Sequence, residues 1–262
     1  MTYDMQVVAR LRAAARDHIP CPPVRDVLPE GDIAAAYAVQ RLLTQARLAD
    51  GATVVGRKIG LTAPVVQAQM GVNQPDFGVL FDDMDVSGDA EVATGRLLQP
   101  RIEAEVAFWL AADLDSDDLS PESVRAAVGH VVGALEIVDS RIADWDITIC
   151  DTVADNASSG LFVLSDRAFK LDDVEPVSVT MRMLRDDVVV SEGSGDACLG
   201  DPLNALLWLA TTARDYGDPL RAGQVVLSGA LGPMVAVHPG DHFTAEFSTL
   251  GTVSAAFSKE DQ

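Results

Sequence analysis

The sequence is poor in aromatic residues, which make up 5% of its 262 positions. A hydrophobic core must therefore be packed mainly with Val, Leu, Ile and Ala, in a chain that is 48% hydrophobic and long enough for one large domain or two small ones. Positive charge is also scarce, because 19 basic residues face 40 acidic residues and give a net charge of −21. This balance argues against nucleic acid or an anionic membrane as a partner, and an anionic substrate would need a local reversal of charge.

Cysteine is scarce as well, with Cys21, Cys150 and Cys198 at wide spacings. No C-x-x-C motif is present, so neither a disulfide framework nor a thiolate zinc site is indicated, and a reducing cytoplasm is expected. The four histidines form no H-x-H or H-E-x-x-H motif. No apolar run approaches the length that spans a membrane, and the N-terminal stretch, with charges scattered through it, does not resemble a signal peptide.

Hydrophobic residues at helical spacing predict several helices. They are expected at residues 4–18, 31–49, 121 to about 130, and 202–216. Asp32 and Asp201 stand at the positions of N-caps for the second and fourth of these helices, and Gly217 lies just past the end of the last.

The remaining apolar segments predict short strands, which dominate the second half of the chain. The strand candidates are TVVGRKIGL, RIEAEVAFWL, QVVLSG, MVAVHPGD, HFTAEFS and TVSAAFS, with VSVTMRML and DVVVSEG as a hairpin that turns at Asp186-Asp187. PDFGVLF is expected to be a loop that leads into a short extended segment. This order of elements indicates an α+β fold with a small helical N-terminal part, residues 1–50, and a larger strand-rich domain, residues 51–262.

Two carboxylates stand inside the predicted strand QPRIEAEVAFWL. Side chains alternate along a strand, so Glu103 and Glu105 share one face. A third carboxylate, Glu136, lies in the apolar run VVGALEIV. Buried acids need a cation, and oxygen ligands alone suit a hard divalent ion such as Mg²⁺ or Mn²⁺. The spacing alone leaves a second interpretation open, in which the pair lies on a solvated strand face and Glu136 on a helix surface.

Four further segments combine glycine or other small residues with polar groups. GRKIGLT places Arg57 and Lys58 between glycines, where a cation suits a carboxylate or assists proton transfer, although a solvated edge lysine is equally compatible. GVNQPDFG presents Asp76 on a turn led by proline, a position typical of ordinary turn residues too. DTVADNASSG is expected to be a polar loop. SGALGPM is expected between two strands, where its backbone N–H groups would hold an anion or simply form a hairpin turn.

Together these segments resemble a known family. The motifs GRKIGLT, GVNQPDFG, LLQPRIEAEVAF, ALEIVDSRI, DTVADNASSG, CLGDPLNALLWLA and SGALGPMVAVHPGD are similar, in this order, to those of the 2-keto-4-pentenoate hydratases of bacterial aromatic meta-cleavage pathways. These enzymes belong to the fumarylacetoacetate hydrolase superfamily. The resemblance covers about residues 30–258. It implies a fumarylacetoacetase-like mixed β-sheet roll, a divalent metal, and a homo-oligomer such as a pentamer or decamer.

The resemblance also implies roles for particular residues. It implies a metal site of Glu103, Glu105 and Glu136. Lys58 and Asp76 are the catalytic candidates, and the substrate-binding candidates are Arg57, Leu61, Ser158, Ser159, Ser228 and Gly229. The expected reaction is hydration of the small anion 2-hydroxypenta-2,4-dienoate. The related 2-oxo-3-hexenedioate decarboxylases differ at the glycine–lysine motif and at the aspartate turn, so hydration is favoured over decarboxylation. A non-catalytic, metal-binding relative is the remaining alternative.

Overall fold

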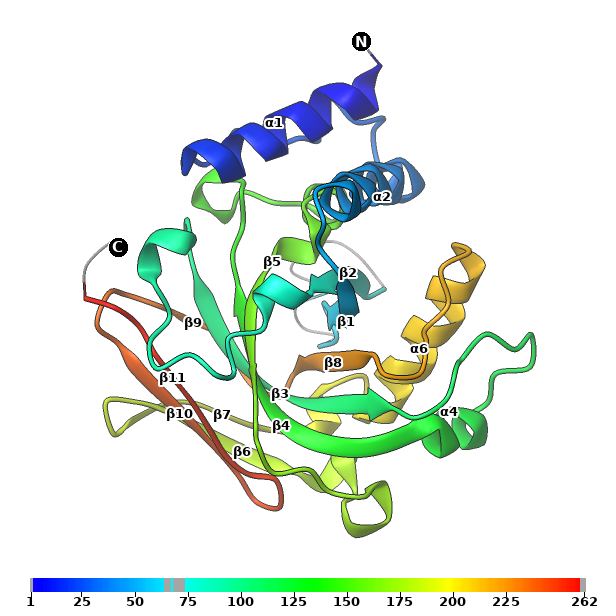
Figure 1. Ribbon diagram of the computed structural model, residues 1–262, viewed down its shortest axis with the longest axis vertical. Coiled ribbons are helices and arrows are strands. Elements are labelled where there is room, and N and C mark those ends of the chain that lie inside the picture. The colour runs from blue at the N-terminus through cyan, green and yellow to red at the C-terminus, as the bar shows by residue number, and fades with distance from the viewer. Residues whose placement is uncertain (1, 64–66, 68–73, 260–262) are drawn as a thin grey trace.

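A computed structural model describes residues 2–63, 67 and 74–259 of the chain. Its described residues form two β-sheets with helices around them (Figure 1). The helices are α1 (Tyr3–Asp17), α2 (Ile33–Ala49), α4 (Pro121–Ala127), α5 (Ile149–Ala154) and α6 (Pro202–Asp215). The strands are β1 (Val54–Gly60), β2 (Asp76–Phe81), β3 (Arg101–Leu110), β4 (Val128–Val138), β5 (Ser159–Leu164), β6 (Thr180–Arg185), β7 (Val188–Ser194), β8 (Val225–Ala230), β9 (Val235–Ala236), β10 (His242–Phe247) and β11 (Gly251–Ala256).

The larger sheet is mixed and strongly curved. Its strand order is β2-β1-β8-β3-β4-β5, and the short β9 pairs with β3. The β1–β8 pair is parallel and the other neighbours are antiparallel. The long strands β3 and β4 bend through the molecule (Figure 1), and the two edge strands, β2 and β5, come into contact. The predicted α+β class and mixed β-sheet roll are thus confirmed.

The smaller sheet is antiparallel, in the order β11-β10-β6-β7, and packs against β4. A close approach between the sheets explains one glycine. The ring of Phe247 on β10 lies so near Gly133 on β4 that a Cβ atom there would come within 2.8 Å of it. A larger side chain at Gly133 would therefore force the two sheets apart.

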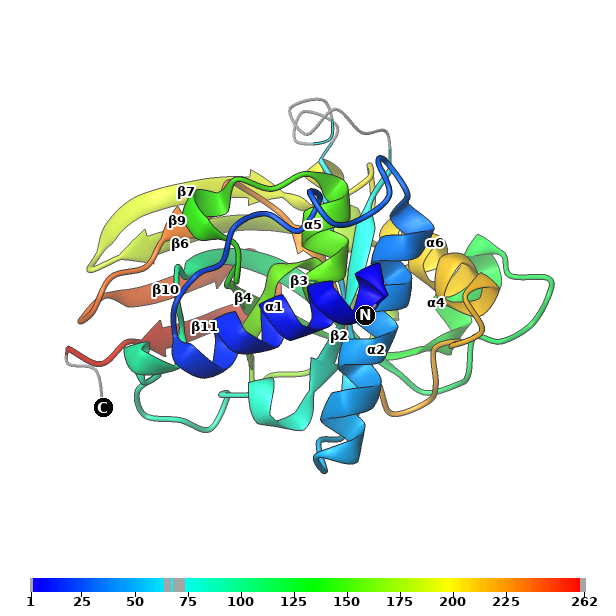
Figure 2. The same cartoon turned by 90° about the horizontal axis from the view of Figure 1, so that it is seen from above.

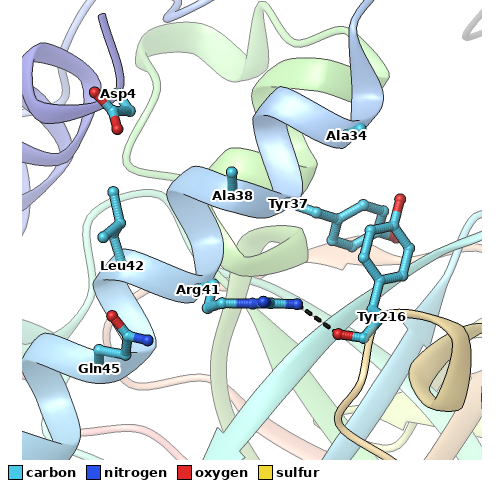
Figure 3. Close-up of a pocket in the computed structure, with 8 residues that line it drawn as sticks. All are labelled: Asp4, Ala34, Tyr37, Ala38, Arg41, Leu42, Gln45 and Tyr216. Carbon is cyan, nitrogen blue, oxygen red and sulfur yellow. Dashed lines mark hydrogen bonds between the residues drawn. The ribbon is translucent and has the colours of Figure 1, made fainter. Parts of the chain in front are cut away.

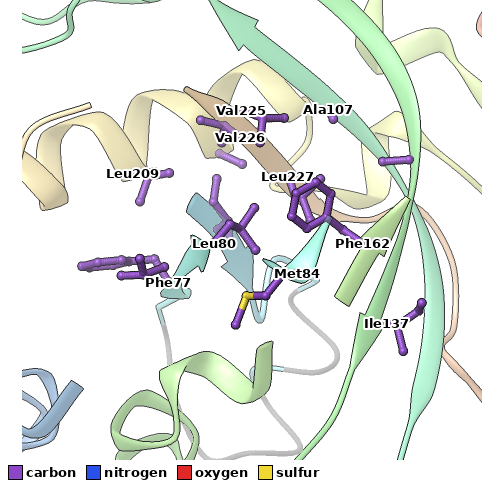
Figure 4. Packing of buried hydrophobic residues seen from close by; sticks show 14 of the residues in the cluster. Phe77, Leu80, Met84, Ala107, Ile137, Phe162, Leu209, Val225, Val226 and Leu227 are labelled. Carbon is purple, nitrogen blue, oxygen red and sulfur yellow. The ribbon is translucent and has the colours of Figure 1, made fainter. Parts of the chain in front are cut away.

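The hydrophobic core is built largely from aliphatic side chains, as the low aromatic content predicts. Leu80 of β2, Phe162 of β5, Leu209 of α6 and Leu227 of β8 contribute to the same cluster (Figure 4). All of them are buried. Full burial of a side chain of this size contributes about 1.5–3 kcal/mol relative to exposure, so this cluster holds the sheet and α6 together.

The capping residues predicted for α2 and α6 occupy their expected places. The Asp32 side chain accepts a hydrogen bond from Ala35 N at 2.9 Å, and the Asp201 side chain accepts one from Leu203 N at 2.9 Å. Gly217 takes a φ of +77° after α6, a conformation that suits glycine at a helix C-terminus. The predicted helical periods and their caps are therefore confirmed, as is the hairpin of β6 and β7.

Two predicted segments differ in the structure. The helix that begins at Pro121 ends at Ala127, and the chain continues directly as β4, so His130 lies on a strand. The β-branched residues that follow favour a strand that pairs along the whole of β3. The segment DTVADNASSG is not a loop. It forms most of α5, a short 3₁₀ turn and the start of β5, because its small apolar residues pack into the core.

Three boundaries also shift. Asp76 is the first residue of β2, paired with Gly60, rather than a turn residue. SGALGPM begins inside β8, and the strand expected in MVAVHPGD shrinks to β9. Residues 71–73 of the GVNQPDFG motif lie outside the described residues.

Helices α1 and α2 lie together on one side of the molecule, and α2 packs on α5 (Figure 2). The division into parts at residues 50 and 51 stays a prediction. None of the described helices has the length and apolar character needed to cross a membrane.

Candidate metal centre and active site

Three glutamates meet on the adjacent strands β3 and β4. Glu103 is paired directly with Glu136, and Glu105 follows on the same face of β3. Their side chains are withdrawn from solvent, since the exposed fractions are 8% for Glu103, 0% for Glu105 and 1% for Glu136. Carboxylate oxygens of all three lie within 4.8 Å of one another. The solvated-face interpretation is therefore wrong for both strands.

The oxygens of this cluster are short of hydrogen-bond donors. Glu105 Oε2 accepts a hydrogen bond from Gly229 N at 2.7 Å. Glu105 Oε1 and both oxygens of Glu136 accept none from the described part of the chain. Lys58 Nζ lies 3.1 Å from Glu136 Oε1, as an ion pair without hydrogen-bond geometry. Buried acceptors without donors are costly, and like charges paired across two strands repel, so the cluster is complete only with a cation.

The chemistry of the donors fits a hard divalent ion. All three groups are carboxylates, which Mg²⁺ and Mn²⁺ prefer, and the described neighbours add no thiolate or imidazole. Burial, together with the charge of Glu136, raises the pKa of Glu103 to about 7, although Lys58 opposes the shift. Burial also raises the pKa of Glu105, with the charges of Glu136 and Glu103 adding to it. A divalent cation would relieve this repulsion and hold the carboxylates in their ionised form.

Lys58 and Asp76 reach the same region from β1 and β2. Asp76 is paired with Gly60, and Gly60 lies two residues after Lys58, so the two side chains share a face of the sheet. Both are buried. Burial lowers the pKa of Lys58, but the surrounding carboxylates outweigh it and raise that pKa above its usual range. Burial raises the pKa of Asp76, while Lys58 and a hydrogen bond from the Thr152 side chain oppose the shift.

Gly60 has a steric reason to be glycine. A Cβ atom at this position would lie 2.3 Å from Asp76 Oδ1 and 3.4 Å from Lys58 Nζ. Any side chain would therefore push Asp76 away from the ammonium group. The glycine in the GRKIGLT motif thus lets Lys58 and Asp76 occupy one compact space.

Three of the substrate-binding candidates bind other residues of the protein. Arg57 points away from the glutamates, because it alternates with Lys58 along β1, and forms an ion pair with Asp218. Ser228 Oγ donates a hydrogen bond to Val106 O at 2.7 Å. The Gly229 backbone N–H does hold an anion, as the SGALGPM motif suggested, but that anion is the carboxylate of Glu105.

The remaining candidates follow β1 and α5 in the chain. Leu61 follows Gly60 in the left-handed conformation, with a φ of +57°. Ser158 Oγ lies 3.3 Å from Thr152 Oγ1, and Ser159 Oγ donates a hydrogen bond to Asn156 O at 2.7 Å. Thr152, the hydrogen-bond partner of Asp76, was missed by sequence reasoning. Its presence in the DTVADNASSG motif was the available signal, but only the fold shows which hydroxyl faces Asp76.

Comparison with known proteins agrees with this geometry. Residues 53–258 match the model of the fumarylacetoacetate hydrolase C-terminal family. The chain belongs to the fumarylacetoacetate hydrolase family. It is 52% identical over 250 residues to "2-keto-4-pentenoate hydratase 2" of Dechloromonas aromatica, with 95% of each chain covered. It is 51% identical over 249 residues to "TodF product hydratase" of Pseudomonas putida F1, with 95% of this chain and 93% of the relative covered. The resemblance drawn from the motifs is confirmed.

A solved structure shares the fold over almost all of the chain. The 4-oxalocrotonate decarboxylase of Pseudomonas putida G7, complexed with magnesium and adipate, superposes with a TM-score of 0.91 at 34% identity and covers 97% of both chains. A divalent metal is thus bound by a close structural relative, in keeping with the three-carboxylate cluster of this chain.

Proposed function

We propose that this protein is a divalent-metal-dependent hydratase that converts 2-hydroxypenta-2,4-dienoate to 4-hydroxy-2-oxopentanoate. The observation that carries the proposal is the buried cluster of Glu103, Glu105 and Glu136, with unsatisfied oxygens and with Lys58 beside it. Support for this substrate class comes from relatives at 52% identity that are named 2-keto-4-pentenoate hydratases.

Charge balance gives the first physical reason. The substrate is an anion, and the site already holds three carboxylates in a chain of net charge −21. A bound Mg²⁺ or Mn²⁺ would offset two of these charges and stabilise negative charge that develops on the 2-oxygen of the substrate. Lys58 supplies a cation of the chain itself, 3.1 Å from Glu136.

The reaction needs proton transfers in each of two steps, and Lys58 and Asp76 are placed to serve them. In the first step the dienol gives up its hydroxyl proton and gains a proton at C5, which leaves a C3=C4 double bond conjugated with the 2-oxo group. In the second step water adds to C4, its proton departs, and C3 is protonated. We assign to Lys58 the stabilisation of negative charge on the 2-oxygen and to Asp76 the acceptance of a proton from water. The burial of both groups excludes competing solvent.

A decarboxylase of the same family is the second candidate, and the structural similarity to the 4-oxalocrotonate decarboxylase favours it specifically. Sequence identity favours the hydratase, at 52% against 34%. The two activities differ in their products, so one experiment distinguishes them.

The test is ultraviolet monitoring of freshly prepared 2-hydroxypenta-2,4-dienoate with purified protein, with Mg²⁺ or Mn²⁺ and with EDTA. We expect the dienol absorbance to fall, 4-hydroxy-2-oxopentanoate to form, and EDTA to stop the reaction. In a parallel assay, 2-oxo-3-hexenedioate should release no CO₂. Rapid CO₂ release without hydration would overturn the proposal in favour of the decarboxylase.

The preferred metal, the oligomeric state and the location stay predictions within this proposal. Metal titration of the EDTA-treated protein compares Mg²⁺ with Mn²⁺. Light scattering measures whether the protein is the pentamer or decamer expected from the resemblance. Cell fractionation checks the expected cytoplasmic location.

A further inference from the structure

Helix α2 contacts the strand that carries Asp76 through two side chains, Tyr37 and Gln40. We infer that Tyr37 and Gln40 are positioning residues, which fix Asp76 by binding the backbone of the next residue, Phe77. The inference rests on the proposed function, because it takes Asp76 as a catalytic group. It extends that function to a helix outside residues 53–258, the part of the chain that matches the family model.

The position of β2 in the sheet explains why such contacts are needed. β2 is an edge strand, so among the described residues the outward backbone groups of its alternate residues have no neighbouring strand to bind. At Val79, the Asn156 side chain supplies both partners: Asn156 Oδ1 accepts from Val79 N at 2.8 Å, and Asn156 Nδ2 donates to Val79 O at 2.9 Å. Two residues earlier, at Phe77, α2 performs the same task with two side chains.

Gln40 joins β2 to α5 through a single amide group. Its side chain is 4% exposed, and Nε2 donates hydrogen bonds to Phe77 O at 2.9 Å and to Val153 O at 3.0 Å. Phe77 follows Asp76, and Val153 follows Thr152, whose side chain hydrogen-bonds to Asp76. The amide therefore holds the backbone beside both members of the Asp76–Thr152 pair.

Tyr37 holds the other backbone group of Phe77. Its hydroxyl accepts a hydrogen bond from Phe77 N at 3.3 Å, and the two rings stack with centroids 4.6 Å apart. The ring of Tyr216 packs on Tyr37 at the same centroid distance, as seen beside α2 in Figure 3. Arg41 in turn donates a hydrogen bond to Tyr216 O at 2.5 Å. These contacts leave Tyr37 little freedom, so its hydroxyl is a fixed acceptor.

The first test compares two substitutions of the same kind on α2. Gln40→Met removes the donor of both hydrogen bonds with little change in volume. We expect kcat for dienol hydration to fall about 10- to 100-fold, because small displacements of a reacting group are this costly. Mg²⁺ affinity should not change, since the glutamates lie on β3 and β4. Gln45→Met, at an exposed position of the same helix (Figure 3), should keep wild-type kcat.

A double-mutant cycle distinguishes positioning from a general structural role. If Gln40 acts through Asp76, Gln40→Met should have almost no further effect on kcat in an Asp76→Asn background. A general loss of structure would lower kcat by the same factor in both backgrounds, and that result would overturn the inference.

Tyr37→Phe keeps the inference testable if Gln40→Met does not fold. It removes the hydroxyl but retains the ring stack, and we expect kcat to fall a few-fold. Tyr216→Phe, the matched control in the same aromatic cluster, should keep wild-type kcat. The inference would be overturned if both Gln40→Met and Tyr37→Phe kept wild-type kcat, or if Tyr37→Phe kept it and Gln40→Met did not fold. Either result would leave the hydratase proposal intact. An inactive wild-type protein would overturn both.

Discussion

The buried carboxylate of α5 and those of β3 and β4 have opposite surroundings. On α5, Asp151 accepts hydrogen bonds from the backbone N–H groups of Val24 and Arg25, each at 2.8 Å, and from the Arg25 guanidinium at 2.7 Å. On β3 and β4, Glu105 accepts one such bond, and Glu136 accepts none from the described residues. Asp151, Glu105 and Glu136 are nevertheless all buried, with exposed fractions of 0%, 0% and 1%.

The difference shows that burial alone does not reveal whether a carboxylate has a structural or a ligand-binding role. A carboxylate whose oxygens are all bound to donors is a structural link, and Asp151 links the segment after α1 to α5. A buried carboxylate with free oxygens is destabilising in the metal-free protein, so its presence indicates a ligand that completes it. The number of donors per oxygen therefore distinguishes the two roles better than the exposed fraction does.

The largest effect is expected from Lys58, the only ion-pair partner of Glu136 among the described residues. Lys58→Ala should lower kcat about 10²- to 10⁴-fold, which is the usual cost of losing an acid, base or charge stabiliser. Metal affinity should not weaken, because lysine is not a ligand. Lys58→Arg should restore kcat only in part, since a guanidinium does not release its proton. Steady-state kinetics at saturating Mg²⁺ measure kcat, and calorimetric titration measures metal affinity. A wild-type kcat in Lys58→Ala would remove Lys58 from the mechanism.

Glu103→Gln should separate metal binding from folding. We expect at least about a 100-fold loss of Mg²⁺ affinity and a corresponding loss of activity at low Mg²⁺. The thermal midpoint of the metal-free variant should equal or exceed that of the metal-free wild type, because one repelling charge is gone. Normal turnover at low Mg²⁺ would show that the three-carboxylate site is wrong.

Asp151→Asn should give the opposite result. The variant loses charge-assisted hydrogen bonds in the interior, so we expect the free energy of unfolding to fall by about 2–3 kcal/mol. The folded variant should bind Mg²⁺ as the wild type does. Urea denaturation measures the free energy of unfolding, and metal titration measures Mg²⁺ affinity. A drop in Mg²⁺ affinity with unchanged stability would contradict the structural role given to Asp151.

The smallest effect concerns pH. The pKa of Glu103 is raised to about 7, mainly by burial. Below that pH the metal-free protein holds a proton that a metal must displace, so metal affinity should fall about tenfold per pH unit for each displaced proton. Between the unfolded-state pKa and 7, the folded metal-free state binds more protons than the unfolded state, and its stability should decrease as the pH rises. Metal titrations at pH 6, 7 and 8 measure the first trend, which should be weaker in Glu103→Gln.

Much of this architecture follows from local sequence patterns. The periods of α1, α2 and α6, the caps Asp32 and Asp201, and the alternation in β3 are properties of neighbouring residues, and each was predictable. The switch from α4 to β4 was not, because a full-length pairing with β3 decides it. Long-range pairing thus fixes the residue at which the helix ends and the strand begins.

The same limit applies to the site. The glutamates, Lys58 and Asp76 carry recognisable spacing and motifs, whereas their partners lie far away in the sequence. Nothing near Gly229 indicates that its N–H holds Glu105, and nothing near Arg57 indicates its pairing with Asp218. Those contacts depend on which strands become neighbours, which a single sequence does not specify.

The place of β8 in the large sheet has a consequence for how the protein matures. In the large sheet β1 is joined to β3 through β8, a strand that begins at Val225. A growing polypeptide can form the β1–β2 pair and the β3–β4–β5 meander before β8 exists, and Asn156 can already bind Val79 of β2. The sheet that carries the lysine and the acidic cluster is complete only after β8 has been made and has inserted between β1 and β3. A chain without β8 also lacks the Gly229 N–H that binds Glu105, and closure of this most distant pairing is the expected slow step of folding.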